Sequence, residues 1–295
     1  MTSSTRAWAQ IHFCVLLWGF TAILGRLISL PAPALVWWRM LIVSTALICW
    51  PRVWRGIAAL SLKLIAIYAG IGILVALHWL AFYSAIKLSN ASVAATCIAM
   101  SPVFLAWFEP LLTRRRFNMR EMMLGVAVIP AVALVVGGTP TGMNFGIVVG
   151  IVAAALVAVF GSLNKRYVEQ ADPLTVTCIE IGAGALFLTV VGPLLMNEQS
   201  MFALPTPRDA TYLLILALVC TLLPFALSLV ALRKLTAFGA QLAVNLEPVY
   251  AILLAIPLLG EQRELSRQFY VGVAAIMAVV LAHPYLTRER AVSHK

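Results

Sequence analysis

The chain has 295 residues, of which 62% are hydrophobic and 11% charged, and its formal net charge is +10. Soluble domains contain about 25% charged residues, so this chain lacks the polar side chains needed to cover a water-exposed surface. The composition excludes a water-soluble globular protein and makes lipid the expected solvent. The positive charge does not indicate a nucleic-acid partner, because the cations are scattered between apolar runs.

Ten apolar runs follow one another along the chain, most of them near the ~20 residues that a bilayer-spanning helix requires. Helices are expected because backbone polar groups in hydrocarbon must be paired within the segment itself. The runs cover residues 9–28, 32–50, 65–86, 91–112, 120–136, 144–164, 173–195, 210–232, 237–259 and 268–286. The sequence therefore predicts an all-α polytopic membrane protein with ten transmembrane helices.

Lysine and arginine residues are distributed unevenly between the predicted loops. The side that holds both termini carries Arg6, Arg52, Arg55, Lys63, Arg114, Arg115, Arg116, Arg120, Lys165, Arg166, Arg233, Lys234, Arg288, Arg290 and Lys295. The other side carries Arg26, Lys87, Arg208, Arg263 and Arg267. Because cytoplasmic loops are enriched in these residues, both termini are predicted to lie in the cytoplasm.

The chain resembles itself over two halves, residues 1–140 and 141–295. Gly125–Leu134 matches Gly272–Leu281 at an offset of 147 residues, and Ser101–Phe104 falls on Glu247–Tyr250 at an offset of 146. Further matches are Ala85–Leu88 with Ala231–Lys234, and Phe20, Arg26 and Pro33 with Phe160, Arg166 and Pro173 at an offset of 140. Matches in one order with a slowly drifting offset indicate an internal repeat.

Five predicted helices in each half is an odd number, so the second half enters the membrane from the opposite side. The result is two inverted five-helix repeats. Such an architecture supports two nearly equivalent conformations, each open to one side, around a central site. The repeat therefore predicts transport by alternating access.

Depth along the predicted helices selects candidate site residues. At ~1.5 Å per residue across ~30 Å of hydrocarbon, Glu247 and its repeat mate Ser101 both fall near the midplane. By the same arithmetic Arg39 and His78 lie about 20 Å from the cytoplasmic face and Trp18 about 13 Å from it. These residues from five helices are predicted to share a central layer, while Glu180 and Glu109 lie nearer the cytoplasmic side.

Ionisable residues at this depth are functional hypotheses by default. Arg39 is interpreted either as the ligand of a substrate carboxylate, as a gating partner of Glu247, or as half of an ion pair that orients helices. Glu247 is interpreted as a proton-titrating group or as a ligand for an amine. Pro248 and Pro102, which follow Glu247 and Ser101, each predict a kink that either exposes backbone carbonyls to a ligand or only serves packing.

An aromatic cluster accompanies the histidine. His78 and Phe82 share one helical stripe, and Trp79 and Tyr83 the next. A histidine among aromatic rings is suited to stacking on a planar substrate or to titration near neutral pH. The alternative is simple packing between helices.

Several segments together resemble the EamA-type drug/metabolite transporter superfamily. They are Leu17–Ala22, Arg39, Ser101–Val103, Asn245–Pro248 and Leu259–Glu261. The resemblance covers almost the whole chain and implies ten helices in two five-helix repeats. It also implies movement of small metabolites across the bacterial inner membrane, most often export, with amino acids as a frequent cargo.

The predicted substrate-binding set is Trp18, Arg39, His78, Trp79, Tyr83, Ser101, Asn245, Glu247 and Tyr250. The expected partners are a small-molecule substrate, membrane lipids and protons as the candidate coupling ion, with the protein a monomer or weak dimer. No cofactor or metal is expected, because the five cysteines lie inside predicted helices without a metal-site spacing.

Two other classes of function compete with a carrier. An intramembrane enzyme lacks support, because the sequence has no His-Glu-x-x-His or Gly-x-Ser-x-Gly motif and its two aspartates, Asp172 and Asp209, fall in predicted loops. A channel acting on small molecules is the third class. An inverted repeat with one midplane cluster favours a carrier over both.

Overall fold

The computed structural model describes residues 3–114, 116–196, 201–244 and 246–287. Within these ranges every regular element is helical. The first half contains α1 (Ser3–Leu27), α2 (Ala32–Ile48), α3 (Pro51–Ala58), α4 (Leu62–Leu88), α5 (Ala91–Ile98), α6 (Ser101–Thr113) and α7 (Met119–Gly137). The second half contains α8 (Asn144–Tyr167), α9 (Pro173–Val191), α10 (Pro207–Leu214), the π-helical segment η3 (Ile215–Leu222), α11 (Leu223–Leu232), α12 (Ala237–Val244), α13 (Glu247–Leu259) and α14 (Arg267–Thr287). Short 3₁₀ turns at Thr141–Met143, Gly192–Leu195 and Glu261–Arg263 complete the description.

The described residues place a helix in each predicted apolar range, in agreement with an all-α polytopic membrane protein. By length and composition, six helices in the described ranges are sufficient to cross a bilayer: Thr5–Leu27, Leu62–Leu88, Ala91–Thr113, Thr141–Tyr167, Pro173–Leu195 and Pro207–Leu232. A seventh arises if α2 and α3, which meet at 89°, count as one broken span. Three further apolar helices are shorter, at Gly125–Gly137, Glu247–Leu259 and Arg267–Val279.

Two helices are broken at equivalent places. The α5 helix ends at Ile98 and α6 begins at Ser101, while α12 ends at Val244 and α13 begins at Glu247. In each case a proline, Pro102 or Pro248, occupies the first turn of the second helix, where the missing N–H is tolerated. Each predicted proline kink thus coincides with an interruption of the regular helix, and Ala91–Thr113 still has the length of one span.

The ends of these two helices also correspond. The α13 helix ends at Gly260 with φ of 72°, a left-handed conformation that suits glycine. The α6 helix ends at Arg114 with φ of 57°, and Arg114 lies 146 residues before Gly260. A non-glycine residue in this strained conformation indicates that the repeat imposes the same backbone path on both halves.

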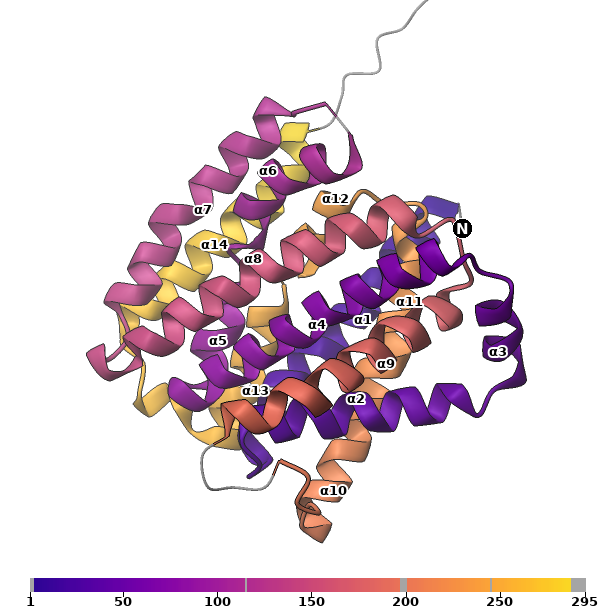
Figure 1. Ribbon diagram of the computed structural model, residues 1–295. Coiled ribbons are helices and arrows are strands. Elements are labelled where there is room, and N and C mark those ends of the chain that lie inside the picture. The colour runs from indigo at the N-terminus through magenta and orange to yellow at the C-terminus, as the bar shows by residue number, and fades with distance from the viewer. Residues whose placement is uncertain (1–2, 115, 197–200, 245, 288–295) are drawn as a thin grey trace, which may run out of the picture.

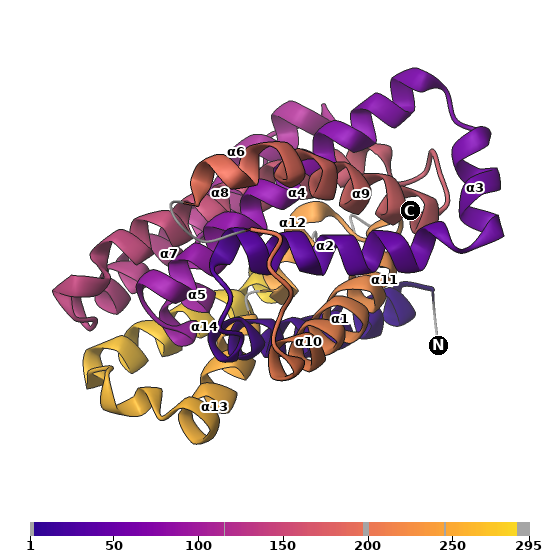
Figure 2. The same cartoon turned by 60° about the horizontal axis from the view of Figure 1, so that its bottom comes forward.

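Helix packing repeats when the two halves are exchanged (Figure 1). The α4 helix packs on α8 as α11 packs on α1, α6 packs on α8 as α13 packs on α1, and α5 packs on α13 as α12 packs on α6. The pairs α2–α9 and α7–α14 map onto themselves. This pattern is that of a pseudo-two-fold relation between the halves. Figure 2 shows α7 and α14 together at one end of the molecule and α3 at the other.

Side-chain contacts follow the same relation. At one end of the bundle the Lys87 ammonium donates to the carbonyl of Ile28 at 2.5 Å. At the other end Arg233 Nε donates to the carbonyl of Val168 at 3.3 Å. Arg233 and Val168 are the repeat mates of Lys87 and Ile28 at offsets of 146 and 140. A cation at the end of the third long helix of each half thus binds the backbone that follows the first helix of that half.

Large apolar side chains cover much of the outer surface. Leu186, Val190, Phe145 and Leu253 are each more than 60% exposed. Such a surface has no counterpart in a soluble monomer, where large exposed apolar patches are rare. The apolar exterior supports lipid as the solvent.

Candidate functional site

A cavity of about 120 Å³ lies where the two halves meet. Its walls come from α1, α2, α4, α5, α6, α8, α11, α12 and α13. Most of the lining is apolar or aromatic, with a few polar groups that converge on the space. The lining residues are Ile11, Trp18, Thr21, Arg39, His78, Trp79, Phe82, Ile98, Leu105, Val157, Phe160, Gly161, Asn164, Phe225, Ser228, Leu229, Leu232, Ala240, Val244 and Glu247.

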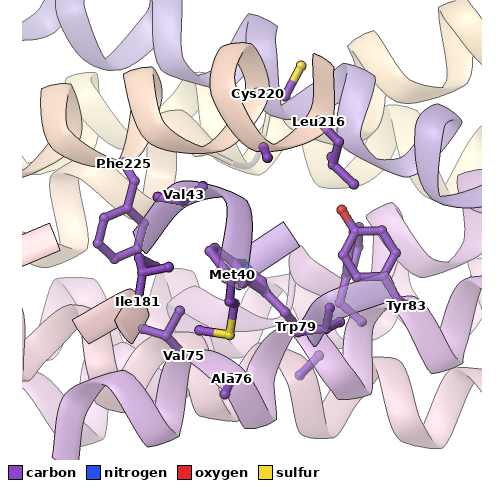
Figure 3. Close-up of a cluster of buried hydrophobic side chains, with 14 of the residues drawn as sticks. Met40, Val43, Val75, Ala76, Trp79, Tyr83, Ile181, Leu216, Cys220 and Phe225 are labelled. Atoms are coloured by element: carbon purple, nitrogen blue, oxygen red, sulfur yellow. The ribbon is translucent and has the colours of Figure 1, made fainter. Parts of the chain in front are cut away.

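Arg39 is held rigidly in the cavity wall and is only 2% exposed. Its Nε donates to Thr221 Oγ1 at 2.5 Å and its Nη1 donates to the Tyr83 hydroxyl at 2.8 Å. The guanidinium carbon lies 3.7 Å from the centroid of the Trp79 ring, a cation–π contact. Figure 3 shows the Tyr83 hydroxyl directed toward the η3 segment that carries Leu216 and Cys220. Two hydrogen bonds and a ring therefore fix the planar head group and its orientation.

Thr221 is available to Arg39 because of the π-helical segment. The Thr221 hydroxyl donates to the carbonyl of Leu216, five residues earlier, at 2.5 Å, and its oxygen accepts from Arg39. Single π-helical stretches within α-helices frequently occur at functional sites. The wider turn of η3 places this hydroxyl between its own backbone and the guanidinium.

Glu247 faces the same cavity from the first turn of α13 and is 6% exposed. In the part of the chain that the structure describes, no carboxylate lies within the 4.0 Å of Arg39 that defines an ion pair. Arg39 and Glu247 therefore line one cavity without neutralising each other through a direct contact. Buried charges are costly unless paired, so this arrangement leaves a cation and an acid available to a ligand.

His78 contacts the backbone through one ring nitrogen, Nδ1. Its Nδ1 lies 2.8 Å from the carbonyl of Ala153. A carbonyl oxygen only accepts, so Nδ1 carries a proton, and Nε2 is an acceptor in the neutral ring. Phe82 stacks at 6.3 Å between ring centroids and Phe160 approaches edge-on at 5.3 Å.

The predicted set divides into residues that line the cavity and residues that do not. Trp18, Arg39, His78, Trp79 and Glu247 line it. Asn245 lies outside the described residues.

Three predicted residues stand behind the cavity wall. Tyr83 is fully buried and reaches the cavity through its hydrogen bond with Arg39. Ser101 is fully buried and donates to the carbonyl of Ile98 at 2.6 Å. Tyr250 packs on α1, where a Cβ built at Gly19 would lie 2.7 Å from the Tyr250 Cβ.

Several lining residues that depth arithmetic missed are repeat mates of one another. Phe225 is the mate of Trp79, and the two rings meet edge to face at 6.1 Å. Val244 is the mate of Ile98, each at an offset of 146 residues. The repeat offset, applied to a predicted site residue, was thus the signal that could have found its partner. The cavity therefore lies at the pseudo-two-fold axis that relates the two halves.

The cavity extends further toward one end of the molecule than toward the other. Asn164, Leu232 and Ala240 line it near the ends of α8 and α11 and the start of α12. Their repeat mates are not part of the lining and are buried by neighbouring helices. The mates are Leu24, Ile86 and Ala94. The cavity thus extends toward the end that carries the α8–α9 loop, which the basic residues predict to be cytoplasmic.

The opposite end is closed by side-chain contacts between the halves. The buried Glu261 carboxylate accepts from the Ala91 N–H at 3.0 Å, the Ser92 N–H at 2.9 Å and the Ser92 hydroxyl at 2.6 Å. Asp209, which lies in the first turn of α10 and not in the predicted loop, accepts from the Ser29 N–H at 2.9 Å and the Ser29 hydroxyl at 2.5 Å. These contacts join helix ends across the two halves.

No metal site is evident in the described residues, which contain no cluster of three or more histidine, cysteine or acidic side chains.

A family model described as the EamA-like transporter family matches residues 9–137 and, a second time, residues 144–282. The chain belongs to the EamA-like transporter family. The resemblance to the drug/metabolite transporter superfamily is thereby confirmed, and the EamA assignment makes this protein a membrane transporter of solutes.

Two further comparisons add little on the cargo. No curated protein matches the sequence. A solved structure titled "Crystal structure of protein" has a TM-score of 0.69, 15% sequence identity, and coverage of 96% of this chain and 98% of its own. At that identity the similarity concerns the fold alone.

Proposed function

We propose that this EamA protein is a secondary transporter that moves small polar metabolites, amino acids or related compounds, by alternating access. Export across the bacterial inner membrane is the proposed direction. One observation carries the proposal: a cavity between two halves with exchangeable packing, lined by an arginine and a glutamate that do not pair with each other. Inverted repeats around a central site are the architecture of alternating access.

Ten transmembrane helices in two inverted halves, 1–140 and 141–295, form part of this proposal. Support comes from the ten helical ranges. The exchange of helix contacts between the halves supports the internal repeat, and an odd number of spans in each half makes the second half inverted. The shorter apolar helix Glu247–Leu259 would cross the membrane together with the preceding helix, Ala237–Val244.

The asymmetric cavity supports a conformation that is open toward the cytoplasm. Both termini are proposed to lie in the cytoplasm. The test is a reporter that is active only in the periplasm, fused to the C-terminus, and activity of this fusion would contradict the orientation. In this conformation the contacts of Glu261 and Asp209 would close the periplasmic side. Transport would require these contacts to open and the equivalent region at the cytoplasmic end to close.

The lining supports a zwitterionic substrate with an apolar or planar part. Arg39 offers its guanidinium to a carboxylate, which it can bind through charge-assisted hydrogen bonds. Glu247 would accept an ammonium group. Trp18 and Trp79, with His78 and its aromatic neighbours, would pack on the side chain of the substrate. An amino acid satisfies all three parts of the site at once.

Counterflow in proteoliposomes tests this function. Vesicles containing the purified protein are loaded with one unlabelled L-amino acid at a time, and uptake of the same labelled compound is followed. We expect saturable uptake and stimulation by internal substrate for at least one amino acid. The Arg39→Gln variant should lose uptake, and the matched variant of an exposed arginine, Arg26→Gln, should retain it.

Two outcomes would overturn the proposal. Flux that does not saturate and is not stimulated by internal substrate would identify a channel. A new chemical product in the vesicles would identify an enzyme. Saturable counterflow of a compound that carries neither a carboxylate nor an amine would support the carrier mechanism and contradict amino acids as the substrate class.

A further inference from the structure

A second buried acid lies beside the cavity and plays no part in the proposed substrate site. Glu180 is on α9 and is fully buried. Its Oε2 accepts a hydrogen bond from Asn164 Nδ2 of α8 at 3.3 Å. Asn164 itself is 3% exposed and lines the cavity. The carboxyl group of Glu180 is therefore one side chain away from the proposed substrate.

Both side chains of this pair carry an unsatisfied oxygen. Glu180 Oε1 and Asn164 Oδ1 are buried and have no hydrogen-bond partner in the structure. Buried polar atoms without partners are rare in native proteins and require an explanation. These two groups are already joined by one hydrogen bond, and a single proton shared between their orphan oxygens would satisfy both.

The surroundings of Glu180 supply no compensating charge. In the described ranges no lysine or arginine lies within 4.0 Å of its carboxyl group. The titratable and charged residues on the elements around α9 have other partners. Four of them donate to backbone carbonyls: Tyr68 to Tyr167, Lys165 to Leu232, Arg166 to Leu112, and Arg233 to Val168 and Ala171. Arg52 pairs with Asp172, Arg39 donates to Thr221 and Tyr83, and Arg55 on α3 makes no ion pair in the described residues.

The backbone of Glu180 is packed closely against α4. A Cβ built at Gly72 of α4 would lie 2.0 Å from the backbone oxygen of Glu180, so α4 and α9 are in direct contact at this point. Metal cations such as Ca²⁺ take about six to eight oxygen ligands, and this pair offers two free oxygens. An unpaired carboxylate in such a place costs several kcal/mol.

We infer that Glu180 and Asn164 form a proton-binding site in which the neutral acid donates from Oε1 to Asn164 Oδ1. The acid and the amide then make a cyclic pair, in which Asn164 Nδ2 donates to Glu180 Oε2 and both orphan oxygens are satisfied. Release of the proton leaves a buried carboxylate that the site cannot neutralise. Because Asn164 also lines the cavity, a substrate that draws on its amide weakens the hold on the proton.

The coupling of this proton to transport rests on the proposed function, whereas its binding does not. Infrared spectroscopy of the purified protein in lipid vesicles tests binding without any substrate. We expect a carbonyl band of a neutral carboxylic acid at neutral pH that shifts in D₂O and disappears as the pH is raised. The band should be missing in Glu180→Gln and retained in Glu169→Gln, which removes an exposed glutamate.

A second variant keeps the test decisive if Glu180→Gln does not fold. Asn164→Leu leaves the acid in place and removes its partner, so the band should move to higher frequency. Replacing choline by sodium at constant ionic strength should leave the band unchanged. The absence of any band that depends on Glu180 or Asn164 would overturn the inference, and so would loss of the band in sodium, which would make the pair a cation site. Failed counterflow with an intact band would overturn only the proposed transport function.

Discussion

Replacing Arg39 by lysine separates the charge of the guanidinium from its geometry. Lysine keeps the positive charge but has a single flexible ammonium group in place of a planar fork. It cannot hold Thr221 and Tyr83 in their present positions while also presenting donors to the cavity. The stacked contact with Trp79 at 3.7 Å would be lost as well.

The magnitude follows from the contacts that disappear. A hydrogen bond to a charged group contributes about 1.5–3 kcal/mol, and each ~1.4 kcal/mol corresponds to a tenfold change in affinity. If the substrate carboxylate loses one of two such bonds, its affinity should fall by about 10- to 100-fold. The charge remains, so transport should persist at high substrate concentration.

The assay is counterflow in proteoliposomes, with the amino acid that gives the largest signal in the wild-type protein. We expect the KM of Arg39→Lys to rise by about one to two orders of magnitude, while the maximal rate changes less. The matched Arg26→Lys variant should keep the wild-type KM, because Arg26 is exposed and outside the cavity. An unchanged KM in Arg39→Lys would refute the assignment of Arg39 to the substrate carboxylate.

Three further predictions concern single contacts. Glu247→Gln should abolish transport or its pH dependence without unfolding the protein, because the carboxylate serves charge chemistry; wild-type transport with an unchanged pH profile would reduce Glu247 to a structural role. Arg39→Ala and Glu247→Ala should show coupling of about 0.5–3 kcal/mol in a double-mutant cycle read as thermal stability, since both charges face one cavity, and strict additivity would argue against any interaction. Gly72→Ala should destabilise the protein by roughly 1–3 kcal/mol in a thermal unfolding assay, because the added Cβ meets the backbone of Glu180; Gly70→Ala, where a Cβ meets nothing within 4 Å, is the control and should be close to neutral.

The helical ranges and the repeat could be read from the sequence because both leave local signals. Apolar runs of membrane length predict helices directly, and a repeat is visible as matching residues at a drifting offset. The extra helix α3 was not predicted, because its eight residues are too short to give a bilayer-length signal. The interruptions before Ser101 and Glu247 could be predicted because Pro102 and Pro248 each remove a helical hydrogen bond there.

Depth along the predicted helices specified a layer of the bundle but not the direction of each side chain. Depth arithmetic selected Trp18, Arg39 and Glu247, which line the cavity. It also selected Ser101, which is fully buried and donates to the carbonyl of Ile98 instead of facing the cavity. Depth specifies a height along each helix, whereas the direction of a side chain depends on how the helices pack.

Non-local geometry explains the residues that the sequence did not reveal. Thr221 reaches Arg39 because η3 is π-helical, and an apolar stretch carries no mark of that conformation. Asn164 and Glu180 are 16 residues apart and meet only because α8 and α9 both pack against α4. The offset of the repeat, applied to Trp79, would have added Phe225 to the predicted set.

Alternating access is tested most directly by cysteine accessibility at two repeat mates, Ala94 and Ala240. Ala240 lines the cavity on its open side, whereas Ala94 is fully buried on the closed side. Single cysteines at these positions, in a protein whose five native cysteines are replaced, are labelled with a membrane-impermeant maleimide from either side of the vesicle. The account predicts that Ala240→Cys is labelled and Ala94→Cys is not, and that transported substrate lowers the first rate and raises the second. Substrate that moves both labelling rates in the same direction would contradict alternating access.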